Sequence, residues 1–272
     1  MMEMMPRGDL KEVPIAYVKV IAENTLITAK WLMSELCIVV FICGSPMQRL
    51  GAYMLEGLVA RLTSSGRSIY NSLRCKEPTS VELFSYMPLL YEICPYFKFG
   101  YLSANGAITD AMKNENSIHI IDFQVAQCSQ WITLIHALAA RPGGPHESAS
   151  RRLMISHQLT PEEGGLKLDG LLRMVKSLSP KIVTLVKQES NTNTVQFFPS
   201  FLETLNYYLS VFESIDVALP RNHKERINVE QHCLAREIVD ILACEGAERV
   251  EHHKLLERWS HDFLWPVLNP IC

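Results

Sequence analysis

The sequence lacks the cysteine and histidine patterns of a metal site or a disulfide-stabilised domain. None of its eight cysteines forms a Cys-x-x-Cys pair or has a histidine at zinc-finger spacing. Glu251, His252 and His253 are adjacent on a predicted helix, so their side chains point in different directions. We therefore expect no metal and reduced, intracellular thiols. The cysteines are Cys37, Cys43, Cys75, Cys94, Cys128, Cys233, Cys244 and Cys272.

The sequence also lacks a long apolar run. Its longest, Cys37–Cys43, is far shorter than the roughly 20 residues that a membrane span requires. Residues 1–9 contain no apolar stretch of the kind found in signal peptides. With 48% hydrophobic and 20% charged residues, the composition is that of an ordinary globular protein, and we expect a soluble cytosolic or nuclear one.

An excess of positive charge is absent as well, since the formal net charge is -3. The one basic cluster, Arg221–Arg226, contains Glu225, and a solvated loop is favoured over a phosphate-binding site. Leu168–Leu172 has the L-x-x-L-L spacing of a coactivator helix, which we attribute to chance. DNA contact, if made, is therefore expected to be indirect.

What the sequence does contain is one clear strand–loop–helix unit. Ile118–Phe123 is apolar except for His119 and Asp122, which is typical of a parallel strand buried on both faces. A polar loop follows, and a helix with apolar spacing continues from Trp131 to Ala139. Ligands of doubly wound sheets usually bind at such a loop.

This loop, Gln124–Ser129, contains no glycine, although cofactor loops need glycines to turn tightly beside the ligand. We therefore predict no cofactor, with a methyltransferase-like enzyme as the competing hypothesis. Asp122 could be catalytic or bind a ribose, but capping the next helix or bonding loop amides is the favoured interpretation. His119 is interpreted as a satisfied core histidine, and no catalytic residue is predicted.

Helical patterns dominate residues 1–113, which we expect to form a helical cap. The clearest pattern has apolar residues at spacings of three and four, and further helices are predicted over 81–93 and 102–113. The first of these faces consists of Leu50, Met54, Gly57, Leu58 and Leu62.

Residues 114–272 are predicted to form an α/β core. Buried or edge strands are expected over 182–186 and 212–218, whereas 146–165 shows little pattern. Helical spacing predicts helices over 197–211, 228–244 and 252–259.

Several long motifs resemble those of one protein family. Ser117–Trp131 contains Ile118, His119, Ile120, Ile121 and Asp122, which resemble the VHIID motif of the GRAS family of plant transcriptional regulators, especially its phytochrome-A signal-transduction branch. Gln48–Arg61 and Cys94–Gly100 resemble the first leucine-rich region. Three further segments resemble the PFYRE motif, and their motif residues include Phe201, Tyr208, Arg236 and Glu237.

The resemblance implies a nuclear protein, with a cytoplasmic pool left open, that regulates transcription in plant signalling and development, with light signalling as one setting. It implies no catalytic activity, and partners that are other transcription factors or GRAS-type proteins. The implied fold is α/β: a helical cap on a Rossmann-like, methyltransferase-like parallel sheet.

The chain departs from the family between Pro145 and Leu171, where GRAS proteins have a second leucine-rich region and three further strands. The C-terminal SAW motif is also missing after Trp259. We therefore expect an incomplete core in which the strands at 118–123 and 182–186 are not neighbours. A non-functional truncated form is the remaining alternative.

Overall fold

The computed structural model describes residues 40–63, 80–115, 117–122, 128–140, 152–157, 168–192, 194 and 196–251, together with positions 15, 34, 37, 38, 253, 255 and 257. The chain forms two compact units. Unit 1 comprises residues 1–95 and 189–254, and unit 2 comprises residues 96–188 and 255–272. In the described ranges, no helix is long and apolar enough to cross a membrane.

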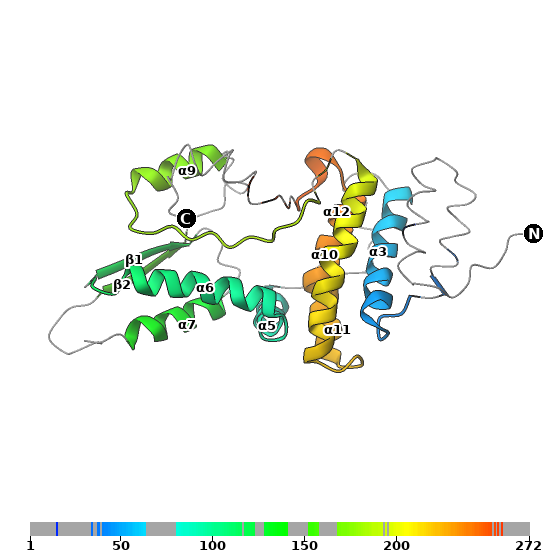
Figure 1. The fold of residues 1–272 in the computed structure, drawn as a ribbon, viewed down its shortest axis with the longest axis horizontal. Helices are drawn as coiled ribbons and strands as arrows, with labels where there is room; N and C mark the ends of the chain where they lie inside the picture. The colour runs from blue at the N-terminus through cyan, green and yellow to red at the C-terminus, as the bar shows by residue number, and fades with distance from the viewer. Residues whose placement is uncertain are drawn as a thin grey trace, which may run out of the picture. The chain divides into compact units, whose positions relative to one another are not determined.

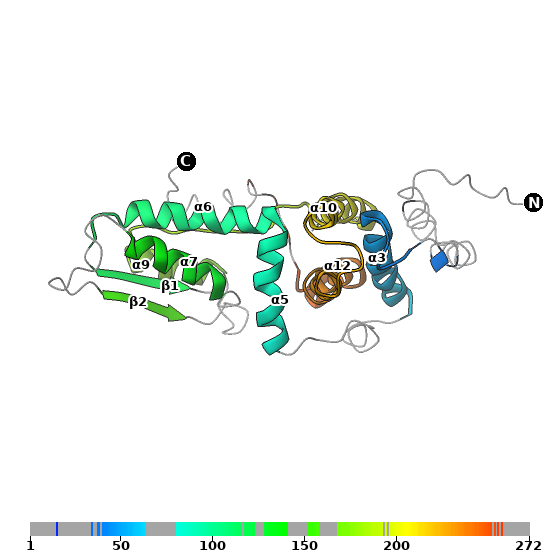
Figure 2. The same ribbon diagram turned by 90° about the horizontal axis from the view of Figure 1, so that it is seen from below.

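Unit 1 is helical. Its described elements are α3 (Pro46–Thr63), α5 (Ser80–Ile93), α10 (Phe197–Ala218), α11 (Lys224–Val229), the π turn η1 (Glu230–Leu234), α12 (Ala235–Ala243) and the short 3₁₀ turn η2 (Gly246–Glu248). Helix α3 packs against α12 and α10, as both ribbon views show (Figures 1 and 2). The most N-terminal described helix is thus joined to segments from near the other end of the sequence.

Helix α3 begins with a capping box. The Ser45 hydroxyl accepts a hydrogen bond from the Gln48 amide at 3.4 Å, and the Gln48 side chain accepts one from the Ser45 amide at 2.9 Å. Pro46 occupies the first helical position, where its missing N–H costs nothing. The predicted apolar face is confirmed, because Leu50, Met54 and Leu58 are fully buried, whereas Leu62 at its end is exposed.

Unit 2 contains a parallel pair of strands, β1 (Ser117–Asp122) and β2 (Arg152–His157), with Ser117 opposite Arg152 and Asp122 opposite His157. Its helices are α6 (Pro95–Ala111), α7 (Cys128–Ala139) and α9 (Leu168–Ser177). In Figure 1, α9 lies on one side of the strands and α6 and α7 lie on the other. A small core joins Ile108, Ile118, Leu134 and Leu138. The predicted strand–loop–helix unit is thereby confirmed, apart from residues 123–127, which lie outside the described residues.

Two predicted strands are wrong, and one strand was not predicted. Residues 182–186 are extended but form no ladder in the described part of the chain, and 212–218 continue helix α10. Phe212 and Ile215 are three residues apart and both fully buried, so helical spacing outweighs the apparent alternation. Strand β2 instead lies in the stretch that showed little pattern.

Strand β1 is not buried on both faces, because its burial alternates at the start and is only partial from Ile120 onward. His119 is exposed, which corrects its interpretation as a core histidine. The described part of the chain is therefore mainly helical with one parallel strand pair.

The helix predicted over 228–244 begins four residues earlier and contains the π turn η1. Most of the predicted helix at 252–259 lies outside the described residues. The observed units also divide the chain differently from a cap at 1–113 and a core at 114–272, because α10 and α12 pack on α3. The motif-based division stays a prediction.

Candidate functional site

The described part of unit 1 contains an open cavity of about 390 Å³ beside α12. It brings together both predicted residues of the PFYRE sequence on this helix, Arg236 and Glu237. Its lining consists of Met87, His232, Cys233, Arg236, Glu237, Asp240, Val250 and Glu251. We refer to it as the α12 groove.

The local backbone explains why these residues share one wall. Cys233, Arg236, Glu237 and Asp240 follow one another at helical spacings of three, one and three, so they lie on one face. The π turn η1 precedes α12 and contributes His232 and Cys233 to the groove. Single π turns inside helices are frequent at functional sites. The turn also places Glu230, which is fully buried, in the helical core.

Tyrosines from α10 lie against the inner wall of the α12 groove. The Tyr208 hydroxyl donates a hydrogen bond to Glu237 Oε2 at 2.8 Å, and Tyr208 is fully buried. Burial and the neighbouring Glu237 carboxylate raise the pKa values of Tyr207 and Tyr208 well above that of a free tyrosine. The hydrogen bond from Tyr208 fixes the position of Glu237.

The outer rim is shaped by Asp240. One of its carboxylate oxygens accepts hydrogen bonds from the Val250 amide at 3.0 Å and the Glu251 amide at 2.7 Å. This pair of bonds anchors the segment after α12 beside the groove. Val250 itself is 68% exposed. The rim thus offers an apolar side chain next to the charges of Arg236 and Glu251.

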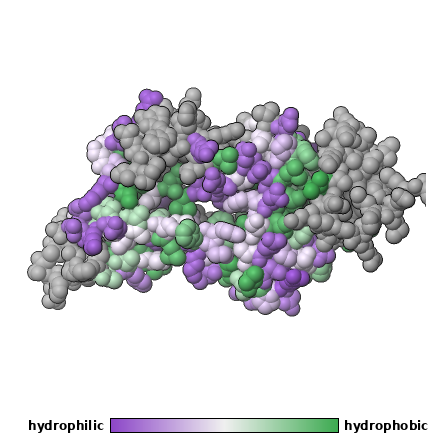
Figure 3. All heavy atoms as spheres, viewed as in Figure 1, coloured by the Kyte–Doolittle hydropathy of each residue, from purple (hydrophilic) through white to green (hydrophobic). Residues whose placement is uncertain are grey.

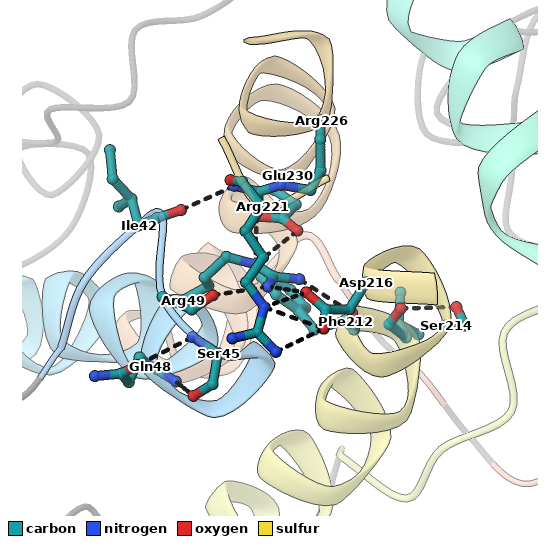
Figure 4. Close-up of polar contacts among 12 residues, drawn as sticks. Ile42, Ser45, Gln48, Arg49, Phe212, Ser214, Asp216, Arg221, Arg226 and Glu230 are labelled. Carbon is teal, nitrogen blue, oxygen red and sulfur yellow. Dashed lines mark hydrogen bonds and ion pairs between the residues drawn. The ribbon is translucent and has the colours of Figure 1, made fainter. Parts of the chain in front are cut away.

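A buried network of charges connects α3, α10, α11 and η1 (Figure 4). Arg49 of α3 donates through Nε to Glu230 at 3.1 Å and through Nη1 to Asp216 at 2.6 Å. Arg226 pairs with Glu230 one helical turn away. Arg49, Arg226 and Glu230 are all fully buried. The network joins α3, α10 and the π turn, so it fixes the frame in which the groove is built.

The two acids of this network titrate differently. Burial raises the pKa of Glu230 above that of a free glutamate, although Arg49 and Arg226 oppose that shift. Burial also acts to raise the pKa of Asp216, but hydrogen bonds from Arg221 and Arg49 outweigh it and hold that pKa below its usual range. The surroundings of Asp216 thus favour its ionised form, whereas burial disfavours the ionised form of Glu230.

The groove is poorly suited to covalent chemistry. Burial raises the pKa of Cys233 to about 12, so its thiol is not a nucleophile at neutral pH. No group of three metal-ligating side chains occurs among the described residues. Arg236 and Glu251 instead present opposite charges beside an exposed valine. Such a surface can hold a polar side chain of another protein.

The VHIID residues lie in unit 2 and form most of strand β1. Ile118 is buried, Ile120 and Ile121 are half-buried, and Asp122 accepts a hydrogen bond from the Trp131 indole at 3.1 Å. Asp122 thus ties β1 to α7 through the Trp131 side chain. The loop at 123–127 lies outside the described residues, so the expected contact of Asp122 with loop amides or the helix cap stays a prediction. Phe201, from the PFYRE segment, is fully buried in α10.

The basic cluster at 221–226 is not simply a solvated loop. Arg226 is fully buried, whereas Arg221, at 53% side-chain exposure, and Lys224 at the start of α11 are exposed as that prediction requires. The i, i+4 spacing of Arg226 and Glu230 was a usable signal for this pair. The position of Arg49, next to Leu50 of the apolar face of α3, was a second signal of a buried charge. Leu168–Leu172 begins helix α9, but its side chains lie outside the described residues.

Comparisons with known proteins agree with the motifs. Residues 10–153 and 149–265 match the GRAS domain family. The chain is 51% identical to Scarecrow-like protein 21 of Arabidopsis thaliana, over 98% of this chain and 78% of that protein. It is 49% identical to Scarecrow-like transcription factor PAT1 of the same plant, over 96% of this chain and 66% of that protein.

A solved structure, the crystal structure of SCL7 in Oryza sativa, matches with a TM-score of 0.76 and 26% identity, covering 95% of this chain and 84% of that chain. The alignment with Scarecrow-like protein 21 extends over 324 positions, and this chain has 272 residues. The difference, 324 less 272, leaves at least 52 positions of the alignment without a residue in this chain. By its two family matches and these relatives, the chain belongs to the GRAS family.

Proposed function

We propose that this protein regulates transcription in plant signalling and development by binding other proteins in the nucleus, and that it is not an enzyme. The observation that carries the proposal is the 49% identity, over 96% of this chain, to a protein named Scarecrow-like transcription factor PAT1. The match spans 66% of that relative.

Unit 2 is proposed to be the remnant of a Rossmann-like, methyltransferase-like core. Parallel pairing of β1 and β2, with helices on both sides, supports this assignment. The internal positions missing relative to Scarecrow-like protein 21 account for a sheet of two strands among the described residues. A cap drawn from the first leucine-rich region, represented here by α3, would be the better preserved part.

A non-enzymatic role is supported by the side chains that could have been reactive. Asp122 is engaged by the Trp131 indole, and the Cys233 thiol is protonated at neutral pH. The competing methyltransferase-like activity has a direct test. Tight binding of labelled S-adenosylmethionine by the unmodified chain would contradict the proposal, and we expect none.

The partners are proposed to be other transcription factors or GRAS-type proteins, with contact to DNA made through them. The α12 groove is the proposed contact site, because it pairs opposite charges with an exposed valine on a rigid frame. A chain with an intact unit 1 and a reduced unit 2 would compete with full-length relatives for those partners. In a reporter assay, output should then fall as the amount of this chain rises.

The decisive experiment combines that reporter with co-precipitation of a full-length relative's partners. Arg236→Glu and Glu251→Lys reverse two groove charges and should abolish both competition and co-precipitation. Glu203→Lys, an exposed change elsewhere on α10, is the matched control and should have no effect. A fluorescent fusion should report nuclear accumulation. Unchanged reporter output with no co-precipitated partner would contradict the proposal.

A further inference from the structure

The turn that follows α9 contains an exposed serine with a strained backbone. Ser179 has a φ of 49°, in the left-handed region that residues other than glycine rarely adopt. Its amide donates to the Lys176 carbonyl at 3.0 Å and closes the end of the helix. Opening this turn relieves the strain and breaks few hydrogen bonds, so the segment can be bound in another conformation.

Ser179 is followed by Pro180, and a Ser-Pro pair is what proline-directed protein kinases recognise. These enzymes bind the substrate in extended form, and proline fits directly after the serine because it has no N–H to leave unpaired in their cleft. Leu178, Pro180 and Lys181 are all exposed. In the view of Figure 3, hydrophilic residues are visible in the region where Figure 1 draws α9. A kinase can therefore reach the serine together with its neighbours.

A second Ser-Pro pair among the described residues provides a contrast. Ser45 precedes Pro46 at the start of α3, but its side chain is half-buried and its hydroxyl accepts the Gln48 amide at 3.4 Å. The Ser179 hydroxyl is exposed and forms no hydrogen bond with a described residue. Of these two identical dipeptides, the fold therefore presents only the one at Ser179 to an enzyme.

We propose that Ser179 is a phosphorylation site for a proline-directed protein kinase. The Ser179 Oγ attacks the γ-phosphorus of ATP and forms an O–P bond, while the bond from that phosphorus to the β–γ bridging oxygen breaks and ADP leaves. The hydroxyl proton passes to the catalytic carboxylate of the kinase. The product is a phosphoserine with a charge of about −1.5 to −2 at neutral pH.

The charges around Ser179 determine what this phosphate does. Lys181, two residues further on, pairs with Glu115, which precedes β1, and both side chains are exposed. A phosphate next to Lys181 in sequence forms the stronger charge-assisted bond and takes the lysine from Glu115. The partial negative charge at the end of α9 opposes the phosphate, but the exposed Lys176 in the last turn offsets it. Phosphorylation thus releases the contact between the turn after α9 and the residues before β1.

Mass spectrometry of the full chain, after treatment with ATP and a purified kinase, tests the site. One mitogen-activated and one cyclin-dependent kinase serve as the two proline-directed enzymes. The unmodified chain should take up phosphate at Ser179, and Ser179→Ala should lose it. Pro180→Ala should lose it as well, because the serine remains but the proline that selects the kinase is gone. Ser177→Ala, an exposed serine of the same turn without a following proline, is the matched control and should leave Ser179 phosphorylated.

Mapping of the modified peptides separates the sites. Ser45 should take up severalfold less phosphate than Ser179, since its hydroxyl must first leave the capping box. Thr160, which also precedes a proline, lies outside the described residues, and a Thr160→Ala background keeps it apart. No phosphate at Ser179 with either kinase, equal labelling of Ser45, or full labelling of Pro180→Ala would overturn the assignment.

Phosphorus NMR against pH tests the capture of Lys181. A neighbouring ammonium stabilises the dianion, so the pKa of the phosphoserine should lie below the value of roughly 6 expected without such a neighbour. Lys181→Ala should raise it toward that value, whereas Lys187→Ala, beyond the extended residues 182–186, should not. A pKa that Lys181→Ala leaves unchanged would overturn the release of Glu115. The site requires neither the α12 groove nor a transcriptional partner, so its failure would leave the proposed function standing.

Discussion

The two units of the chain handle charge in opposite ways. Unit 1 buries Arg49, Arg226 and Glu230 completely and satisfies each with a partner of opposite charge. In unit 2 the Lys181–Glu115 pair is exposed, at 49% and 41% of the side chains. Exposed apolar side chains do not distinguish the units, since Phe99 of unit 2 is 73% exposed and Val217 of unit 1 is 91% exposed.

The difference indicates which part of the family fold survives a missing internal segment. Arg49 and Glu230 are 181 residues apart in sequence, so the contacts of unit 1 bypass the region where residues are lost. The strands of unit 2 border that region directly. Unit 1 should therefore behave as a complete helical core and unit 2 as an incomplete one, which substitutions can test.

The largest effect is expected from Arg49→Met. Removing the arginine leaves Glu230 with one fewer buried cation and Asp216 without its Nη1 donor, and breaking a buried pair costs roughly 3–5 kcal/mol. Chemical denaturation of the purified chain measures this loss. The triple variant Arg49→Met, Arg226→Met and Glu230→Met should recover part of it, since Asp216 keeps Arg221 and no buried charge is then left without its partner. A loss below about 1 kcal/mol would show that the network does not hold unit 1 together.

An intermediate effect is expected at Gly57, where α3 meets α12. An added Cβ would lie 3.1 Å from Leu242 Cβ and 3.3 Å from Val239 Cα, so Gly57→Ala should cost about 1–3 kcal/mol. Gly106 in α6 is the matched control, because an added Cβ there meets nothing within 4 Å. Gly106→Ala should stabilise the chain by about 0.5–1 kcal/mol through helix propensity. Thermal melts of the two variants should shift in opposite directions.

A smaller loss is expected from Tyr208→Phe, which removes the donor to Glu237 without opening a cavity. A hydrogen bond to a charged group contributes about 1.5–3 kcal/mol, and Glu237 can recover part of this from solvent in the groove, so we expect about 1–2 kcal/mol. The same variant should weaken partner binding at the α12 groove, because Glu237 is no longer held. Equal binding by both forms in a titration would exclude a positioning role for Tyr208.

The smallest effect is expected in unit 2, from Lys181→Ala. An exposed ion pair contributes about 0–1 kcal/mol, and salt screens it. Its removal should leave the midpoint of denaturation almost unchanged. A loss as large as that of Arg49→Met would remove the contrast between the two units.

Local signals in the sequence were sufficient where neighbours along the chain determine structure. The face of α3 and the unit from β1 to α7 were predicted because apolar spacing marks buried faces directly. Residues 182–186 were misjudged for a physical reason: their composition favours a strand, but a ladder needs a partner that is not found among the described residues. The end of α10 was missed because the residues of Phe212–Ala218 alternate as in a strand, although no glycine or proline there stops the helix.

Only some residues of the candidate site could be predicted from the sequence. Arg236 and Glu237 were singled out by resemblance, but their union with Tyr208 depends on α10 packing beside α12. The burial of Arg226 was not anticipated, since a cluster of charged residues usually lies in solvent. Its acceptors include the Ile42 carbonyl, 184 residues away, and no local pattern reports a bond of that range.

Unit 1 is built from two separate parts of the sequence, and this affects how it folds during synthesis. At synthesis rates of roughly 5–20 residues per second, a ribosome needs about 10–40 s to add the 181 positions that separate Arg49 from Glu230. During that interval the apolar face of α3 has no partner from α10 or α12 and is exposed to chaperones. A relative that keeps the 52 or more additional positions must wait longer, so this shorter chain exposes its nascent α3 for less time.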